Sequence, residues 1–383
     1  MPWREASVTR ERSEFVRLAL MEGSNRRELC RRFGISPPTG YKWLRREQAG
    51  EELAERSRRP ATSPRRSEEA VEAAVLAVRH AHPAWGARKI GAVLRARGQL
   101  APAASTIHAI LVRHGCVTPP LGGERAHLRF EKERPNALWQ MDFKGWLRTC
   151  DSRPLHPLTV IDDHSRFVPG LEACTDQTGP VVRAKLERIF RIYGLPDAIF
   201  VDNGPPWGSS GAGRWTRLRV WLLKLGVTLT YARPYHPESR GKNERFHRTL
   251  KAEILSLRSL RDAGHAQMAF DEWREVYNHH RPHEALGQAP PASRYTPSLR
   301  ALPARLAEPD YETDAHVRRV PTTKDYIRFK GRLWKVPEAF RGERVAIRPT
   351  LHDGEFTICF GSHPIAAVDL NTPKPVNDVS EHP

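Results

Sequence analysis

The sequence has few cysteines and no long apolar stretch. Its five cysteines lie far apart among 383 residues, and no two form a C-x-x-C pair, which argues against a disulfide framework and against a thiolate zinc site. No apolar run approaches the roughly 18 residues of a membrane span. The first residues also lack the apolar core of a signal peptide. We therefore expect a cytoplasmic protein with packed thiols and no membrane contact.

Acidic residues are scarce relative to basic ones. The chain has 62 Lys and Arg against 44 Asp and Glu, a formal net charge of +18. A surplus of this size favours a polyanionic partner, and nucleic acid is the first candidate. The length predicts about two to four domains, and no repeat of solenoid period is visible.

Polar, basic and Pro-rich joints divide the chain into four structured stretches. The composition changes at each joint, from apolar periodicity to runs of charge, Pro, Ser and Gly. We predict, in order, a helix-turn-helix domain at 1–50, a basic linker at 51–66, a second helix-turn-helix-like domain at 67–116, a linker at 117–135, an α/β core at 136–287, a Pro-rich linker at 288–316, a small β-barrel at 317–372 and a tail at 373–383.

The first helical stretch has the spacing of a helix-turn-helix unit. After a helix over 14–22, Ser24 is the expected N-cap of a second helix that Gly34 ends, and Ser36 before Pro37 begins a third. An ordinary helical hairpin with a basic surface is the alternative. The third helix carries side chains suited to base edges and phosphates, namely Thr39, Tyr41, Lys42 and Arg45.

A second helical unit is predicted between the two basic joints. Its helices cover 67–82, 85–97 and 102–114, and Pro83, Gly98 and Gly115 end them. A helical spacer is the alternative to a second DNA-reading module. If the unit reads DNA, the contacts come from exposed residues of its last helix: Ser105, Thr106 and His108.

Beyond residue 135 the pattern changes to alternating strands and helices. The order strand, strand, strand, helix, strand, helix, strand, helix is that of a ribonuclease H-like fold. The predicted strands cover 138–146, 158–161, 166–168, 198–201 and 228–231, and the helices cover 180–193, 215–225, 238–257 and 265–280. Short strands at 326–329, 344–347, 356–360 and 365–368 predict the barrel, with basic residues Arg328, Lys330, Arg332 and Lys335.

Three carboxylates of the α/β core stand where a side chain can leave the apolar interior. Asp142 interrupts an apolar strand, where an ionised carboxylate is costly unless a cation or hydrogen bonds compensate it. Asp202 follows the buried run 199–201, at a strand end where α/β sheets present ligands. Glu244 lies in a basic helix. Taken singly, each has a structural alternative, as a salt-bridge partner or a turn residue.

The helix that contains Glu244 is expected to be amphipathic. At about 100° per residue, Phe246, Leu250, Ile254 and Leu257 form the buried stripe, and Glu244, His247, Arg248 and Lys251 lie on roughly the opposite face. We expect DNA contacts from this region, with His236, Lys242, Arg245, His247, Arg248 and Lys251 as the candidates.

Three carboxylates from two strands and one helix can hold two divalent cations for phosphoryl transfer. Hard Mg²⁺ prefers such an oxygen-only site, and the cations offset the repulsion between the acids. The competing acids are Asp162 and Asp163, which fall at a turn between two predicted strands and for which we favour a structural role. His236 and His247 lack the further N or S donors of a transition-metal site.

The segments around Asp142 (Trp139 to Phe143), Asp202 (Val201 to Gly204) and Glu244 (Arg233 to Lys251) resemble the three motifs of DDE transposases and retroviral-type integrases. The resemblance is closest to the transposases of bacterial insertion sequences and extends to the domain order of nearly the whole chain. It implies that the three acids bind metal and catalyse. Glu244 stands 42 positions after Asp202, several more than the family usually has, and we place the surplus in 208–213.

What the resemblance implies is a Mg²⁺-dependent transposase, with Mn²⁺ as a possible substitute, in the nucleoid of a bacterium. Such an enzyme binds the terminal inverted repeats of its element in double-stranded DNA, cleaves strands to give 3′-OH ends and joins these to target DNA. A homo-oligomer on DNA is expected because two ends need two sites. The alternatives are a structure-specific nuclease on the same fold and an inactive DNA-binding regulator.

Overall fold

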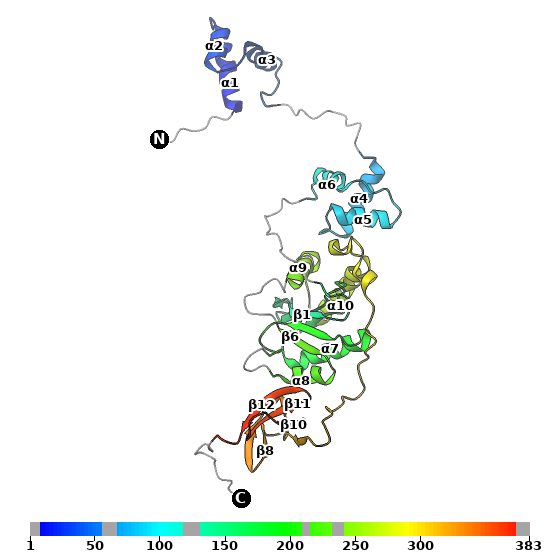
Figure 1. Ribbon diagram of the computed structural model, residues 1–383. Helices are drawn as coiled ribbons and strands as arrows, with labels where there is room; N and C mark the ends of the chain where they lie inside the picture. Colours follow the sequence, from blue (N-terminus) through cyan, green and yellow to red (C-terminus); the bar gives the residue numbers. More distant parts are fainter. Residues whose placement is uncertain (1–7, 56–66, 118–130, 209–214, 232–240, 373–383) are drawn as a thin grey trace. The chain divides into compact units, whose positions relative to one another are not determined.

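The computed structural model describes residues 8–55, 67–117, 131–208, 215–231 and 241–372 (Figure 1). The chain divides into two compact units, residues 1–67 and 68–383, and each has its own apolar cores. Within the described ranges no helix is long and apolar enough to span a membrane.

The first unit is a bundle of three helices, α1 (Val8–Ala19), α2 (Arg26–Arg32) and α3 (Pro37–Gln48). Ser36 caps α3 as predicted, because its hydroxyl accepts a hydrogen bond from the Thr39 N–H. The prediction for α2 was wrong by one residue: the cap is Asn25, whose side chain accepts from the Glu28 N–H at 3.2 Å, whereas the Ser24 hydroxyl donates back to Ala19. Only the later position places an oxygen three residues before that N–H.

Close packing of α3 on α1 requires a glycine. A Cβ atom at Gly40 would stand 2.6 Å from the Cys30 sulfur and 2.8 Å from the Phe15 ring, so any larger residue would force the helices apart. Gly34 supplies the left-handed turn between α2 and α3, with φ at +63°. The buried side chains of Trp43 and Leu44 complete the core of this unit.

The second helical group lies in the second unit and comprises α4 (Glu69–Ala81), α5 (Ala87–Ala96) and α6 (Ala104–Arg113). Val75, Ile90, Ile107 and neighbouring side chains form its core, against which Val276 of the α/β core also packs. An Arg88–Glu284 contact of 2.7 Å joins the two parts on the surface. This helical group is therefore docked on the α/β core.

The central sheet has antiparallel and parallel halves. Strand β1 (Trp139–Phe143) pairs antiparallel with β3 (Pro154–Asp162) and parallel with β5 (Ala198–Val201). The edges are β6 (Thr228–Tyr231), parallel to β5, and β4 (Gly170–Cys174) with the short β2 (Leu147–Arg148), both antiparallel to β3. The strand predicted at 166–168 is wrong: these residues continue the turn after β3, and β4 begins at Gly170.

Helices cover both faces of the sheet (Figure 1). On one face, α7 (Gly179–Tyr193) and α8 (Arg217–Lys224) pack on alternate residues of β1, β3 and β5, such as Met141, Val160 and Val201. On the other, α9 (Gly241–Leu250) and α10 (Ala263–Glu275) pack on residues such as Ile161. Each of these two helices continues into a π-helical turn, Lys251–Leu255 and Val276–His280.

The segment after these helices follows the surface of the core. It contains the short helices Glu284–Leu286 and Pro291–Arg294. The Tyr295 ring stacks on Phe167 with 4.1 Å between centroids. The Arg300 guanidinium donates to the carbonyl oxygens of Pro196, Leu225 and Gly226. The first part of the predicted Pro-rich linker thus packs on the core.

The C-terminal region is a β structure of two pieces. The predicted strands are present as β8 (Tyr326–Phe329), β10 (Arg344–Pro349), β11 (Glu355–Phe360) and β12 (His363–Asp369), and the sequence analysis missed β7 (His316–Arg319) and β9 (Arg332–Lys335). The strands form an antiparallel sheet in the order β12-β11-β10-β7 and a β8-β9 hairpin. Closure into a barrel stays a prediction.

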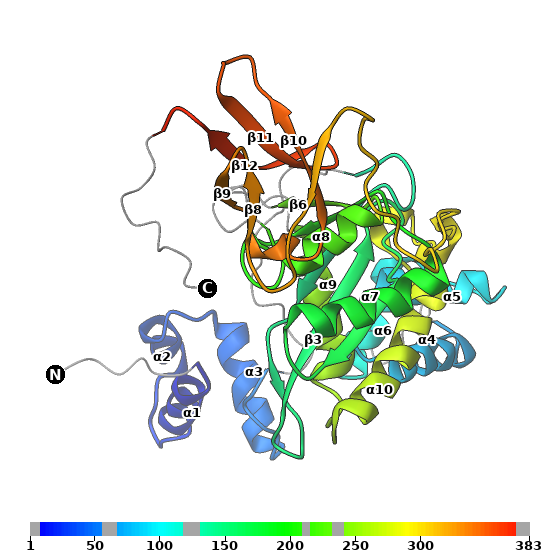
Figure 2. The same cartoon turned by 90° about the horizontal axis from the view of Figure 1, so that it is seen from below.

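The C-terminal strands share an apolar core with α8, and Figure 2 shows them beside that helix. Val220 of α8 is buried among the side chains of this core, and Trp215 and Leu223 pack against it. The Lys224 ammonium lies 2.8 Å from the Glu343 carboxylate. Helix α8 is therefore enclosed between two apolar cores.

Candidate active site

Asp142 lies in β1, and Asp202 directly follows the neighbouring parallel strand β5. Trp139 pairs with Ile199 and Gln140 with Phe200, and Asp142 and Asp202 each follow the second of these pairs by two residues. In parallel strands, paired residues point to the same face of the sheet. Asp142 thus lies near the carboxyl end of β1, and Asp202 lies just beyond the carboxyl end of β5.

Both aspartates lie on the face of the sheet that α9 covers. Their immediate neighbours Met141 and Val201 are buried under α7 and α8 on the opposite face, and side chains alternate between faces along a strand. The Asp142 side chain is 33% exposed, and Asp202 is half-buried. This edge of the sheet thus combines two carboxylates with access to solvent.

Glu244 stands on α9 with an exposed side chain. The predicted buried stripe is correct for Phe246, Leu250 and Ile254, but Leu257 is 54% exposed because the π-helical turn ends before it. The prediction that His247 shares the exposed face of Glu244 was wrong. The His247 ring is buried against β1 and β3 instead.

His247 connects α9 to the strand that carries Asp142. Its Nε2 lies 2.9 Å from the Thr159 hydroxyl, and that hydroxyl donates to the Asp142 carbonyl oxygen at 2.8 Å. Because the Thr159 hydrogen is used there, Nε2 must carry the ring hydrogen, and Nδ1 then faces the Asp142 carboxylate at 3.9 Å with a lone pair. Burial, aided by Lys144, lowers the pKa of His247 to about 4, so the ring is neutral at neutral pH.

Asp163 is fully buried and bound on several sides. Its Oδ1 accepts from Gln140 Nε2 at 2.7 Å and from Lys242 Nζ at 2.5 Å. Its Oδ2 accepts from the Lys132 N–H at 2.8 Å. Burial lowers the pKa of Lys242, and the bond to Asp163 offsets part of that effect. The Lys242 ammonium, a predicted DNA contact, is thus directed to a carboxylate of its own chain.

Asp162 is equally buried and closes the turn after β3. Its carboxylate accepts from the Asn136 N–H at 2.7 Å and from the N–H and hydroxyl of Ser165 at 2.7 and 2.6 Å. Burial raises the pKa of Asp162, and the hydrogen bonds with Ser165 oppose this. These contacts are those of a structural acid, the role favoured for this pair.

The donor chemistry of the three predicted acids fits a hard divalent cation, because it consists of carboxylate oxygens. Asp142 and Asp202 lie at the carboxyl ends of the parallel strands β1 and β5, and Glu244 is on α9. In the ranges that the structure describes, however, no three His, Cys, Asp or Glu side chains lie close enough together to hold a metal ion. Glu244 must therefore approach the two aspartates for a three-carboxylate site to form.

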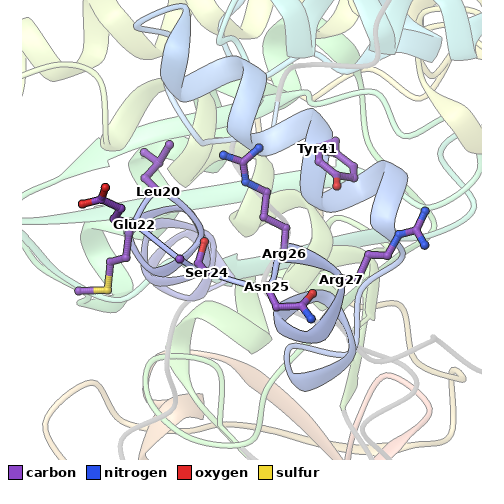
Figure 3. Close-up of a pocket in the computed structure, with 9 residues that line it drawn as sticks. Leu20, Glu22, Ser24, Asn25, Arg26, Arg27 and Tyr41 are labelled. Carbon is purple, nitrogen blue, oxygen red and sulfur yellow. The ribbon is translucent and has the colours of Figure 1, made fainter.

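The predicted DNA contacts of the first unit are accessible. Tyr41, Lys42 and Arg45 are exposed and Thr39 is half-buried on α3. Tyr41 also lines an open pocket of about 570 Å³ together with Arg26 and Arg27 (Figure 3). These two arginines are the first residues of α2, and the sequence analysis did not include them among the predicted DNA contacts. Their position directly after the helix cap is the feature that could have indicated them.

The remaining DNA candidates divide into exposed and buried residues. Ser105, Thr106 and His108 on α6 are exposed, as the sequence predicted, and so are Arg245, Arg248 and Lys251 around α9. His247 and Lys242 make the internal contacts described above. His236 lies outside the described residues. Sequence reasoning also missed Gln140 and Thr159, two buried polar residues whose place between apolar neighbours was the only signal.

Comparisons with protein families match most parts of the chain. Two models described as integrase core domain match residues 132–237 and 225–291. A model described as the C-terminal domain of IS481 family transposases matches 315–375. Models described as a helix-turn-helix domain and a homeodomain-like domain match 11–61 and 39–111.

Proteins of bacterial insertion elements are among the similar sequences. The chain is 29% identical over 158 residues to an uncharacterized 31.7 kDa protein of insertion element IS407 from Burkholderia multivorans, covering 41% of this chain and 54% of that protein. It is 28% identical over 187 residues to an uncharacterized 39.2 kDa protein of IS476 from Xanthomonas euvesicatoria, covering 49% and 51%. The chain thus spans about half the length of these curated relatives.

Retroviral proteins are also similar. The Gag-Pro-Pol polyprotein of Simian retrovirus SRV-2 is 35% identical over 127 residues, which cover 32% of this chain and 6% of the polyprotein. Among solved structures, a chain of the simian T-cell lymphotropic virus intasome has 20% identity and a TM-score of 0.37, covering 78% of this chain and 99% of that chain. The HTLV-2 integrase catalytic core in complex with magnesium has 14% identity and a TM-score of 0.33, covering 43% and 99%.

The matched families follow the order of the folded parts. Helix-turn-helix models match the helical N-terminal region, integrase core models match the α/β region, and the IS481 model matches the C-terminal strands. The insertion-element relatives agree with this assignment. In chain order, therefore, the protein contains parts similar to helix-turn-helix domains, to the integrase core domain and to the C-terminal domain of IS481 family transposases.

Proposed function

We propose that the protein binds the terminal inverted repeats of a mobile element, cleaves DNA strands to give 3′-OH ends and joins these ends to target DNA. Water is the nucleophile in the first reaction and the 3′-OH in the second, so one site serves both. The substrate is double-stranded DNA in the nucleoid of a bacterium. Two element ends require two sites, which makes the DNA-bound form at least a dimer.

The observation that carries this proposal is the position of Asp142 and Asp202 at the carboxyl ends of two strands that pair in parallel. Continued by two residues, the β1–β5 register would bring these carboxylates together, where they would repel each other unless cations lie between them or beside them. They share the face of the sheet with α9, whose exposed residues Arg245 and Arg248 carry positive charge. A cation site beside a basic helix suits the phosphate backbone of DNA.

Glu244 is the third proposed carboxylate. It lies one helical turn before His247, and residues three apart on a helix are neighbours on its surface. His247 reaches to 3.9 Å from the Asp142 carboxylate, and we propose that the exposed Glu244 side chain rotates toward that carboxylate when metal binds. Bound Mg²⁺, or Mn²⁺ in its place, would activate the attacking oxygen and stabilise the leaving one.

Recognition of the element ends is assigned to the helix-turn-helix parts. Thr39, Tyr41, Lys42 and Arg45 of α3, with Arg26 and Arg27 of α2, would contact base edges and phosphates, and Ser105, Thr106 and His108 of α6 would add a second contact region. Replacing Lys42 by Gln should lower affinity for all duplexes and reduce the salt slope by about 1, if it contacts one phosphate.

The direct test is a reaction of the purified chain with labelled duplexes from the two ends of its own element and a supercoiled target plasmid. We expect nicked ends and joined products in Mg²⁺ or Mn²⁺, and neither after chelation. Cleavage without joining would identify a structure-specific nuclease. Specific binding of the ends without cleavage in either metal would identify an inactive regulator and refute the proposal.

A further inference from the structure

Two buried polar residues of the β3 region each bind both β1 and α9, the elements that carry Asp142 and Glu244. Asp163 accepts hydrogen bonds from Gln140 of β1 and Lys242 of α9. Thr159 bonds to the Asp142 carbonyl oxygen of β1 and to His247 of α9. We call these the Asp163 bridge and the Thr159 bridge.

The two bridges hold α9 at two separate points. Asp163 lies four residues beyond Thr159, or roughly 13 Å at the rise of an extended strand. Lys242 is in the first turn of α9 and His247 is near its end. One attachment would let the helix pivot, whereas two fix both its direction and its distance from β1. Glu244 lies between the two attachments.

The contacts of the Asp163 bridge are close to the catalytic candidates in the chain. Gln140 precedes Asp142 by two residues in the same strand and faces the same side of the sheet. Lys242 precedes Glu244 by two residues on α9. A displacement of either partner would therefore be passed to the adjacent carboxylate through a rigid strand or helix.

The energetics of the Asp163 bridge favour a defined geometry. Asp163 is fully buried, and the Lys242 side chain is only 19% exposed. A buried charge is tolerated only with partners in good geometry, and removing one partner leaves the other uncompensated. This pair cannot slide along the interface without losing its hydrogen bonds, unlike the apolar contacts of Phe246 and Leu250 beside it.

We propose that Asp163, Lys242 and Gln140 are positioning residues that set the separation between the Asp142 and Glu244 carboxylates. This inference rests on the proposed function of those two acids. Lys242 then acts inside the protein rather than on the phosphate backbone, and Asp163 acts through its neighbours without touching metal or DNA.

The test compares Lys242→Met with Lys224→Met in the full chain. Lys224 forms a similar ion pair, 13% exposed and 2.8 Å from Glu343, which joins α8 to the C-terminal region and not β3 to α9. Loss of a positioning partner should lower kcat for joining of a pre-cleaved end about 10- to 100-fold. By calorimetry, Mn²⁺ affinity of the protein should also weaken about tenfold. The Kd for the DNA end should stay unchanged, and Lys224→Met should match wild type in all three.

Two outcomes would overturn the inference. If Lys242→Met weakens DNA binding and its salt slope with kcat and Mn²⁺ affinity intact, Lys242 contacts phosphate. If only the melting temperature falls, the bridge is structural. Lys242→Arg, which can still donate to Asp163, should recover most of kcat.

Gln140→Leu removes the hydrogen bond from Gln140 to Asp163 and keeps the Asp163–Lys242 pair. This variant therefore tests the inference even if Lys242→Met fails to fold. We expect the same loss of kcat and Mn²⁺ affinity, and wild-type values would refute the role of Gln140. The controls separate this inference from the proposed function: a wild-type chain that neither cleaves nor joins refutes the function, whereas an active wild type with unaffected bridge variants refutes only the inference.

Discussion

Two pairs of acidic residues lie on or beside the central sheet, and they differ in solvent exposure and in hydrogen bonding. Asp162 ends β3 and Asp163 follows it; both are 0% exposed and accept hydrogen bonds from backbone or side-chain donors of the chain. Asp142 and Asp202 lie at the ends of β1 and β5 and retain access to solvent. The difference teaches that a buried carboxylate whose oxygens accept hydrogen bonds from its own chain stabilises the fold. Accessible carboxylates at the ends of neighbouring strands are instead suited to binding a cation from solution.

The largest effect is expected at the accessible acids. Asp142→Asn, Asp202→Asn and Glu244→Gln keep the volume but each remove one charge from the proposed cation site. Since such ligands contribute several kcal/mol, and each 1.4 kcal/mol is about tenfold, cleavage and joining of a labelled end should fall at least about 1,000-fold. Binding of that end in a gel-shift titration should be unchanged.

Near-normal chemistry in any one of these three variants, at matched DNA occupancy, would remove that residue from the site. The proposed cation site would then contain a different acid in that place, or only two acids. A simultaneous loss of end binding would instead indicate a role in DNA contact.

A smaller effect, on stability and not chemistry, is expected for Asp162→Asn. The amide has one acceptor oxygen, so a donor from Asn136 or Ser165 would face an NH₂ group without a partner. The cost of a buried unsatisfied group is about 1–3 kcal/mol in the free energy of unfolding, measurable by urea titration. Cleavage per folded molecule should stay within a few-fold of wild type; loss of chemistry in a variant that is fully folded would contradict the structural role.

The smallest effect is a pH dependence of the same substitution. Burial raises the pKa of Asp162, so the folded state holds that proton more tightly than the unfolded state. Its contribution to stability is then fully present below the unfolded pKa and is lost as the pH rises through the folded pKa. The stability difference between wild type and Asp162→Asn should therefore be larger at about pH 4.5 than at about pH 7.5. An equal or opposite difference would show that hydrogen bonds with Ser165 outweigh burial.

Much of the architecture was predictable from sequence because local signals agreed with the final fold. Apolar alternation located β1, β5 and β6, and helical periodicity located α7, α8 and α10. The strand expected at 166–168 failed for a tertiary reason: Asn278 bonds to both backbone groups of Val168, and this side chain replaces a neighbouring strand. A contact between residues 110 positions apart leaves no local pattern.

The acids of the candidate site could be predicted from the sequence, but the residues that hold the strands and helix around them could not. Asp142 and Asp202 stand out because a charge follows or interrupts an apolar run, and family resemblance adds Glu244; their role stays a prediction. The burial of His247 could not be predicted from the sequence, since a histidine next to Arg248 in a basic helix is typical of a surface position. Its burial follows from Thr159, a polar residue in the interior of β3, where only pairing in three dimensions brings the two together.

Because α8 packs between two apolar cores, the choice of where to truncate the protein is restricted. The C-terminal family model matches residues 315–375 as one domain. We do not expect them to unfold independently of the α/β core, because Val220 of α8 is buried among their apolar side chains. A truncation at that boundary leaves an apolar helix face in water on the part that remains. A shortened chain would therefore tend to aggregate, and a sequence boundary is here a poor guide to where a crystallisable fragment ends.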